Sequence, residues 1–145
     1  MKTKLCLLIL LIVGLSVQLS ANPINGLLER IDKGASKKFV IEFKKGADDF
    51  FELDQKGTKV VVRGNNYVNI ATGINWYLKY YAGIQLSWNG MQAKLPQVLP
   101  PVPRKERHET SLSLRYDFNY CTYSYTMAFW DWERWEKEID WMALH

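Results

Sequence analysis

Cysteine is scarce in this sequence, with only Cys6 and Cys121 among its 145 residues. Cys6 lies in an N-terminal apolar run that we expect to be removed, so the remaining chain would hold one thiol and no intramolecular disulfide. A disulfide-stapled scaffold is therefore excluded, and stability must come from packing. Cys121 itself is expected to be buried as a small apolar residue.

Signatures of cofactor chemistry are lacking too. The sequence contains no glycine-rich phosphate loop, no Cys or His pair at metal-ligand spacing and no Gly-x-Ser-x-Gly elbow. Its excess of positive charge is small, because the net charge of +4 falls by two, to +2, once Lys2 and Lys4 are removed. Acids alternate with bases except at 104–108, which we interpret as a solvated linker. We expect no cofactor, no metal and no nucleic-acid partner.

Residues 1–21 have the pattern of a secretory signal peptide: a basic start, an apolar run over 5–13 and small residues at the expected cleavage site. The alternative is a membrane anchor. Gly14, Ser16 and Gln18 interrupt the run before it reaches the roughly 20 apolar residues that a spanning helix needs. The sequence thus predicts an exported protein without a stable membrane span, in a periplasmic, extracellular or lysosomal type of compartment.

Residues 22–103 have the pattern of a small α+β domain. Apolar spacing predicts helices over 25–32 and 67–81, while alternation predicts strands over 39–43, 51–53 and 60–62, the last two forming a hairpin. Asn65 or Asn66 can cap the longer helix and Gly83 can close it. Gly73 inside that helix predicts close packing against the sheet. Residues 84–88 are interpreted as one more strand.

Four prolines between 96 and 103 fix an extended path and mark the predicted end of the small domain. Residues 104–145 are then predicted to be a linker and one β/α unit, with strand character over 111–121. A helix follows that begins at Asp131 and pairs Glu133 with Lys137. The helical spacing of its tryptophans favours core packing over a sugar-stacking platform, for Trp130, Trp132 and Trp135.

Three motifs in this second part are unusual: Asn-x-Cys-Thr-x-Ser-Tyr at 119–125, Phe-Trp-Asp-Trp-Glu-Arg-Trp at 129–135 and Glu-Ile-Asp-Trp-Met-Ala-Leu at 138–144. In this order they resemble the opening of the catalytic barrel of the α-N-acetylglucosaminidases, glycoside hydrolase family 89. Upstream, Ala-Thr-Gly at 71–73 and Tyr-Leu-Lys-Tyr-Tyr at 77–81 are similar to the small domain that precedes that barrel. The resemblance implies an α+β domain followed by the truncated start of a (β/α)8 barrel.

The resemblance also implies an activity: exo-acting, retaining hydrolysis of terminal α-linked N-acetylglucosamine from a glycan. Retention needs two carboxyl groups about 5–5.5 Å apart, and the family's two catalytic glutamates lie on later barrel strands. The chain is therefore expected to be an N-terminal fragment that is inactive alone and contains no catalytic residue. Similarity to the family places Asn119 and Cys121 beside the bound sugar, with Tyr125 close by.

Two further expectations concern the chain itself. Its helical acids at 133, 136, 138 and 140 fall opposite the tryptophans, so we interpret them as a solvated face rather than as catalysts. The residues beyond Pro103 should aggregate or stay partly disordered without the rest of a barrel. An alternative function is a stand-alone carbohydrate-binding or interaction module formed by the small domain.

Overall fold

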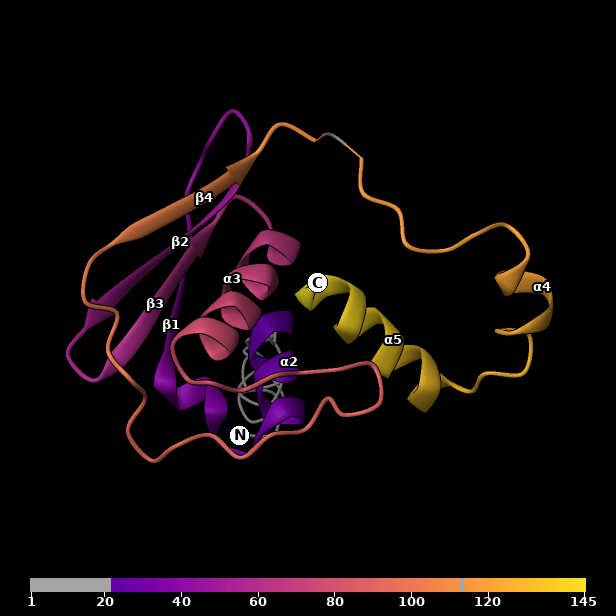
Figure 1. Cartoon of the computed structure of the whole chain (residues 1–145), viewed down its shortest axis with the longest axis horizontal. Coiled ribbons are helices and arrows are strands. Elements are labelled where there is room, and N and C mark those ends of the chain that lie inside the picture. The colour runs from indigo at the N-terminus through magenta and orange to yellow at the C-terminus, as the bar shows by residue number, and fades with distance from the viewer. Residues whose placement is uncertain (1–21, 113) are drawn as a thin grey trace, which may run out of the picture.

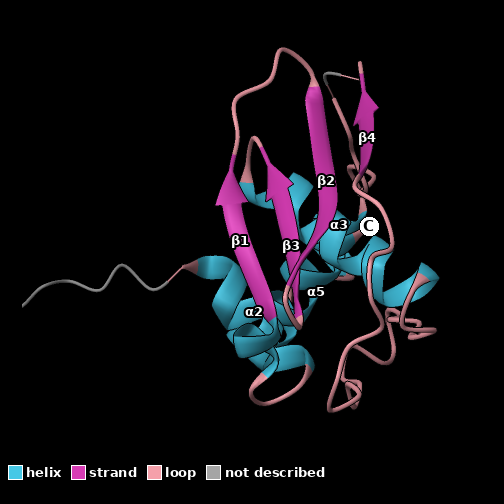
Figure 2. Cartoon of the chain, turned by 90° about the vertical axis from the view of Figure 1, so that its left-hand side faces the viewer, coloured by secondary structure: helices cyan, strands magenta, loops and turns pink. Residues whose placement is uncertain are grey.

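A computed structural model describes residues 22–112 and 114–145, and the predicted signal peptide lies outside this range. The fold is α+β, with a four-stranded sheet and helices that gather on one side of it (Figures 1 and 2). In chain order the elements are α2 (Pro23–Ile31), the 3-10 turn η1 (Ala35–Lys38), β1 (Phe39–Phe43), β2 (Asp49–Lys56), β3 (Lys59–Gly64), α3 (Tyr67–Tyr80), β4 (Glu106–Thr110), α4 (Thr122–Tyr125) and α5 (Trp132–Leu144).

The sheet has the strand order β1-β3-β2-β4. β2 and β3 form the predicted hairpin, in which Lys56 pairs with Lys59 around a turn that contains Gly57. Gly57 has φ of +59°, a backbone conformation that favours glycine. β1 runs parallel to β3, and β4 runs antiparallel to β2. The three strands predicted from alternation are confirmed.

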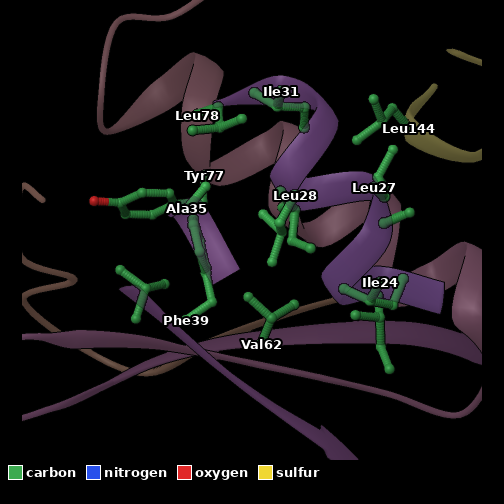
Figure 3. Close-up of a cluster of buried hydrophobic side chains, with 14 of the residues drawn as sticks. Ile24, Leu27, Leu28, Ile31, Ala35, Phe39, Val62, Tyr77, Leu78 and Leu144 are labelled. Carbon is green, nitrogen blue, oxygen red and sulfur yellow. The ribbon is translucent and has the colours of Figure 1, made fainter. Parts of the chain in front are cut away.

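One face of the sheet carries the hydrophobic core, which α2 and α3 cover. Leu28 and Tyr77 are fully buried between the helices and the sheet, next to Phe39 and Val62 (Figure 3). Gly73 allows α3 to approach the sheet, because a Cβ there would lie 2.9 Å from Cγ1 of Val62. The close packing predicted for Gly73 is confirmed.

Both predicted ends of α3 are confirmed. Asn66 caps the helix, since its Oδ1 accepts a hydrogen bond from the backbone N of Asn69 at 2.8 Å. At the other end Gly83 has φ of +66°, and the backbone N of Ile84 donates to the carbonyl of Leu78 at 2.8 Å. This left-handed closure satisfies a carbonyl that the helix leaves free.

The structure differs from the sequence interpretation at 84–88 and at 104–108. No strand forms over 84–88, where Ser87 and Gly90 make one isolated bridge. The basic cluster is not a solvated linker, because β4 begins at Glu106 and pairs with the edge of β2, placing His108 opposite Phe51. The backbone groups on that edge need hydrogen-bond partners, and β4 supplies them. The sheet of the small domain therefore extends to Thr110.

The strand predicted over 111–121 is also not observed. In the described part of this segment the chain is irregular up to the turn at Tyr120, as the long orange path in Figure 1 shows. A lone strand has no neighbour to receive its backbone hydrogen bonds, so its pattern alone cannot form it. The helix predicted to begin at Asp131 is confirmed as α5.

Candidate functional site

The three residues implicated in sugar contact lie around α4. Asn119 Oδ1 accepts hydrogen bonds from the backbone N of Cys121 at 2.9 Å and of Thr122 at 3.0 Å. The hydroxyl of Thr122 donates to the carbonyl of Asn119 at 3.0 Å. Asparagine is favoured in such turns because its side-chain oxygen replaces a backbone acceptor. Asn119 therefore fixes the turn that carries Cys121.

These residues are open to solvent to different degrees. Asn119 is exposed, Tyr125 is 66% exposed at the end of α4, and Cys121 is a half-buried free thiol. Cys121 is thus less buried than the sequence predicts. The structure brings Asn119 and Cys121 into one turn, and their contact with a sugar stays a prediction.

The helix that follows, α5, begins as its sequence predicts. Oδ1 of Asp131 accepts from the backbone N of Arg134 at 2.9 Å, and Lys137 Nζ lies 2.8 Å from Glu133 Oε1. The aromatic side chains in and just before this helix are less buried than the sequence predicts. Trp132 is 69% exposed and Ile139 is 45% exposed, while Trp130 and Trp135 contact each other with ring centroids 5.1 Å apart. The core packing predicted for Trp132 is wrong within the described structure.

Two of the four acids of α5 are buried. Glu138 is 3% exposed and Asp140 is 8% exposed, so the interpretation as a solvated face is wrong for these two acids, although Glu133 is exposed. Asp140 pairs with Arg30 of α2, and Glu138 accepts from Nε1 of Trp88. Glu138 and Asp140 are two positions apart, which is about 200° around the helix axis, so they reach the small domain from two flanks of α5. The opposition of acids and tryptophans expected from the spacing is therefore not found for these two acids.

A cavity of about 710 Å³ lies between β2, β4, the start of α3, residues 114–117 and the last turn of α5. At its polar end Arg115 Nη2 lies 2.6 Å from Asp49 Oδ2. The side chain of Asn69 and the charge of Arg115 hold the pKa of Asp49 below its usual value. His108 and Trp141 contribute to the apolar wall. Sequence reasoning missed this cavity, since its lining comes from segments far apart in the chain and no motif marks them.

A buried carboxylate on the open face of the sheet was also missed. Glu52 is 2% exposed and lies within 2.8–3.2 Å of three cationic groups, those of Lys44, Lys105 and Arg107. Burial alone would raise the pKa of Glu52, but the hydrogen bonds from these cations outweigh it and lower the pKa to about 2. Glu52 is thus ionised at neutral pH. It cannot act as a general acid there, because it carries no proton to donate.

The described chain, which leaves out residues 1–21 and residue 113, bears on two other kinds of site. No group of three or more His, Cys, Asp or Glu residues in this part could hold a metal ion. Within the same part, every helix is too short or too polar to cross a membrane.

Known proteins match both halves of the described chain. The family "Alpha-N-acetylglucosaminidase (NAGLU) N-terminal domain" matches residues 22–101, and the "tim-barrel domain" of the same family matches residues 115–145. The human alpha-N-acetylglucosaminidase is 40% identical over 114 residues, which are 79% of this chain and 15% of the human protein. The chain thus spans about one seventh of the length of the relatives it matches.

Solved structures agree with these matches. A family 89 glycoside hydrolase from Clostridium perfringens, in complex with 2-acetamido-1,2-dideoxynojirmycin, superposes with a TM-score of 0.80 at 38% identity. The match covers 85% of this chain and 14% of that chain. The same values hold for a Clostridium perfringens structure in complex with its substrate GlcNAc-alpha-1,4-galactose. With both of its parts matched, this chain belongs to the alpha-N-acetylglucosaminidase family, glycoside hydrolase family 89.

Proposed function

We propose that this chain provides the small N-terminal domain and the first barrel unit of an exo-acting, retaining α-N-acetylglucosaminidase that removes terminal α-linked N-acetylglucosamine from glycans. The observation that carries the proposal is the match of residues 115–145 to the barrel domain directly after a matched N-terminal domain. The substrate bound in one of the similar structures, GlcNAc-alpha-1,4-galactose, supports the proposed linkage.

The carboxylates within the small domain and α5 support the proposal that this chain is inactive alone. A retaining enzyme needs a nucleophile and an acid/base that are both free to react. Here the buried acids are held by cations: Glu52 by three of them, Asp140 by Arg30 and Glu138 by Arg134. Each of these carboxylates is already engaged in a hydrogen bond to a cationic side chain.

In this proposal Asn119, Cys121 and Tyr125 line the sugar pocket at the end of the first barrel strand. The Nδ2 group of Asn119 can donate to a sugar hydroxyl while its Oδ1 holds the local turn. Cys121 contributes a small, weakly polar surface, and Tyr125 contributes an aromatic one. Cleavage of the signal peptide at about residue 21 would deliver the enzyme to an exported compartment.

The test is the activity of the protein that the complete reading frame around this chain encodes. We expect it to release the chromophore from an α-linked N-acetylglucosaminide and not from the β-linked isomer, while the 145-residue chain releases none. In the active protein, Asn119→Ala should raise KM for the α-linked substrate. Failure of the encoded protein to hydrolyse the α-linked substrate would overturn the proposal.

The alternative function, a stand-alone carbohydrate-binding or interaction module, is supported by one observation: the small domain has its own sheet and its own core. Calorimetric titration of the chain with N-acetylglucosamine and with GlcNAc-α-1,4-galactose tests the carbohydrate branch. Saturable binding by a chain without hydrolytic activity would favour it over the hydrolase.

A further inference from the structure

The helix α5 contacts the small domain through charged as well as apolar side chains. Figure 1 shows α5 lying next to α3 and α2, and α3 is the element that it contacts most. In an ordinary amphipathic helix apolar side chains face the domain and acids face water. Here Glu136 and Asp140 reach Arg30 on one flank of α5 and Glu138 reaches Trp88 on another, while Trp132 and Ile139 are exposed.

Arg30 of α2 makes the first set of contacts. Its Nε and Nη2 atoms donate to the two carboxylate oxygens of Asp140 at 2.5 and 2.7 Å, and its Nη1 lies 3.5 Å from Oε1 of Glu136. This two-pronged geometry is specific to arginine, since a lysine ammonium cannot reproduce it. Gly26, one turn earlier in α2, leaves room, because a Cβ there would lie 3.2 Å from Nη1 of Arg30.

Trp88, in the loop after α3, makes the second set. Its Nε1 donates to Oε2 of Glu138 at 2.8 Å, and Nη2 of Arg134 donates to the same oxygen at 2.7 Å. The guanidinium of Arg134 lies between two rings, 4.6 Å from the centroid of Trp88 and 3.9 Å from that of Trp130. Each buried charge on α5 thus has a partner, either on the small domain or held by it.

Leu144 completes the contact at the C-terminal end of α5. It is fully buried, and Figure 3 shows it beside Leu27 of α2. A helix turns by about 100° per residue, so only one rotation about its axis brings Asp140 to Arg30, Glu138 to Trp88 and Leu144 into the core. A rotation that turned α5 away from this orientation would separate both carboxylates from these partners.

We propose that the small domain is the internal receptor for the first helix of the barrel, which it recognises by charge through Arg30 and Trp88. This inference rests on the proposed function only in that it names α5 as a barrel helix. Recognition by charge has a consequence for assembly: α5 is oriented while the side that carries Trp132 and Ile139 stays open to the elements that complete the barrel. Charge pairs of this kind contribute orientation and partner choice more than net stability.

A charge exchange across the contact tests the proposal in the 145-residue chain. The variants are Arg30→Asp, Asp140→Arg and the double exchange, and the measurement is amide hydrogen exchange of residues 132–144. We expect each single variant to speed exchange in α5 by about tenfold or more, and the double exchange to recover most of the protection. The amides of β2 and β3 should stay protected throughout, which shows that the small domain is folded.

The control is the pair Glu133 and Lys137 on the same helix, whose side chains are 77% and 59% exposed. Exchanging the two charges should leave the protection of α5 unchanged, since an exposed pair contributes little. Should the Arg30 variants lose the β2 and β3 protection, Trp88→Phe replaces them: it removes the Nε1 donor to Glu138 while keeping an aromatic ring beside Arg134, and α5 exchange should still rise.

Unchanged α5 exchange in the single variants and in Trp88→Phe would overturn the proposal, as would a double exchange no better protected than the worse single variant. Because the readout involves no hydrolysis, this failure differs from failure of the proposed enzymatic activity.

Discussion

The small domain and the barrel segment are built on opposite principles within one chain. In residues 22–110 apolar side chains meet inside, as Leu28 and Tyr77 do, and charged side chains cover the open face of the sheet. In the described part of 111–145 the aromatic side chains are largely outside, with Phe129 at 92% and Tyr120 at 89% exposure. The comparison teaches that the first region buries most of its apolar surface, whereas the second has an exposed aromatic surface suited to further partners.

The largest expected effect comes from making the same substitution, leucine to alanine, in each of the two regions. Leu28→Ala should lower the free energy of unfolding by about 3 kcal/mol, because it removes a fully buried side chain and leaves a cavity. Leu114→Ala, at 79% exposure, should change it by less than about 0.5 kcal/mol. Urea denaturation followed by circular dichroism measures both. Equal losses of unfolding free energy in the two variants would contradict the difference between the two regions.

The next largest expected effect is the loss of the stabilisation by Glu52 at acidic pH. Its folded-state pKa of about 2 lies below the ordinary 4.5, so its pairing stabilises the small domain fully above about pH 4.5. That stabilisation is lost as the pH falls towards 2, and it amounts to about 2 kcal/mol after allowing for the half-exposed cations around it. The difference in unfolding free energy between the parent chain and Glu52→Gln should therefore shrink between pH 4.5 and pH 2. A difference that does not vary with pH in this window would contradict the assignment.

A smaller effect compares two asparagines whose side-chain oxygens accept backbone hydrogen bonds, Asn66 at the start of α3 and Asn119 in the turn before α4. Asn66→Ala should cost about 1 kcal/mol, because Asn66 caps a 14-residue helix that packs in the core. Asn119→Ala removes similar hydrogen bonds but should leave the unfolding midpoint unchanged, since α4 has four residues. Thermal melts of the two variants distinguish these outcomes. A lower midpoint for Asn119→Ala would mean that the barrel segment unfolds together with the small domain.

The smallest effect on stability is expected on the aromatic side of the barrel segment. Replacing Phe129 and Trp132 with Ser should change the unfolding free energy by less than about 0.5 kcal/mol, since both are exposed. The same change should raise the monomeric fraction of the chain in sedimentation analysis, because exposed aromatic surface promotes association. If the parent chain is already monomeric at high concentration, the expected aggregation beyond Pro103 is wrong.

Much of the small domain follows from local signals in the sequence. The alternation that forms β1 to β3, the apolar spacing of α3 and the Asn66 cap each act within a few residues, so a pattern can report them. β4 could not be predicted in this way. Its sequence is polar throughout, and it becomes a strand because the edge of β2 requires a partner.

The orientation of α5 is the clearest case that sequence could not decide. From the sequence alone, we expect the apolar side chains of this helix to be buried and its acids to face water. The outcome depends on Arg30 and Trp88, which lie 110 and 50 residues from their carboxylate partners in the sequence. For the candidate site, the motif at 119–125 identifies Asn119 and Cys121, but only the structure reveals that Asn119 also holds its own turn.

The most direct test of the account is the stereochemistry of hydrolysis by the protein encoded by the complete reading frame. Proton NMR of the reaction with GlcNAc-α-1,4-galactose should show α-N-acetylglucosamine as the first product, with the β-anomer arising only later by mutarotation. Release of the β-anomer first would contradict a retaining mechanism, and no release at all would contradict the proposed activity.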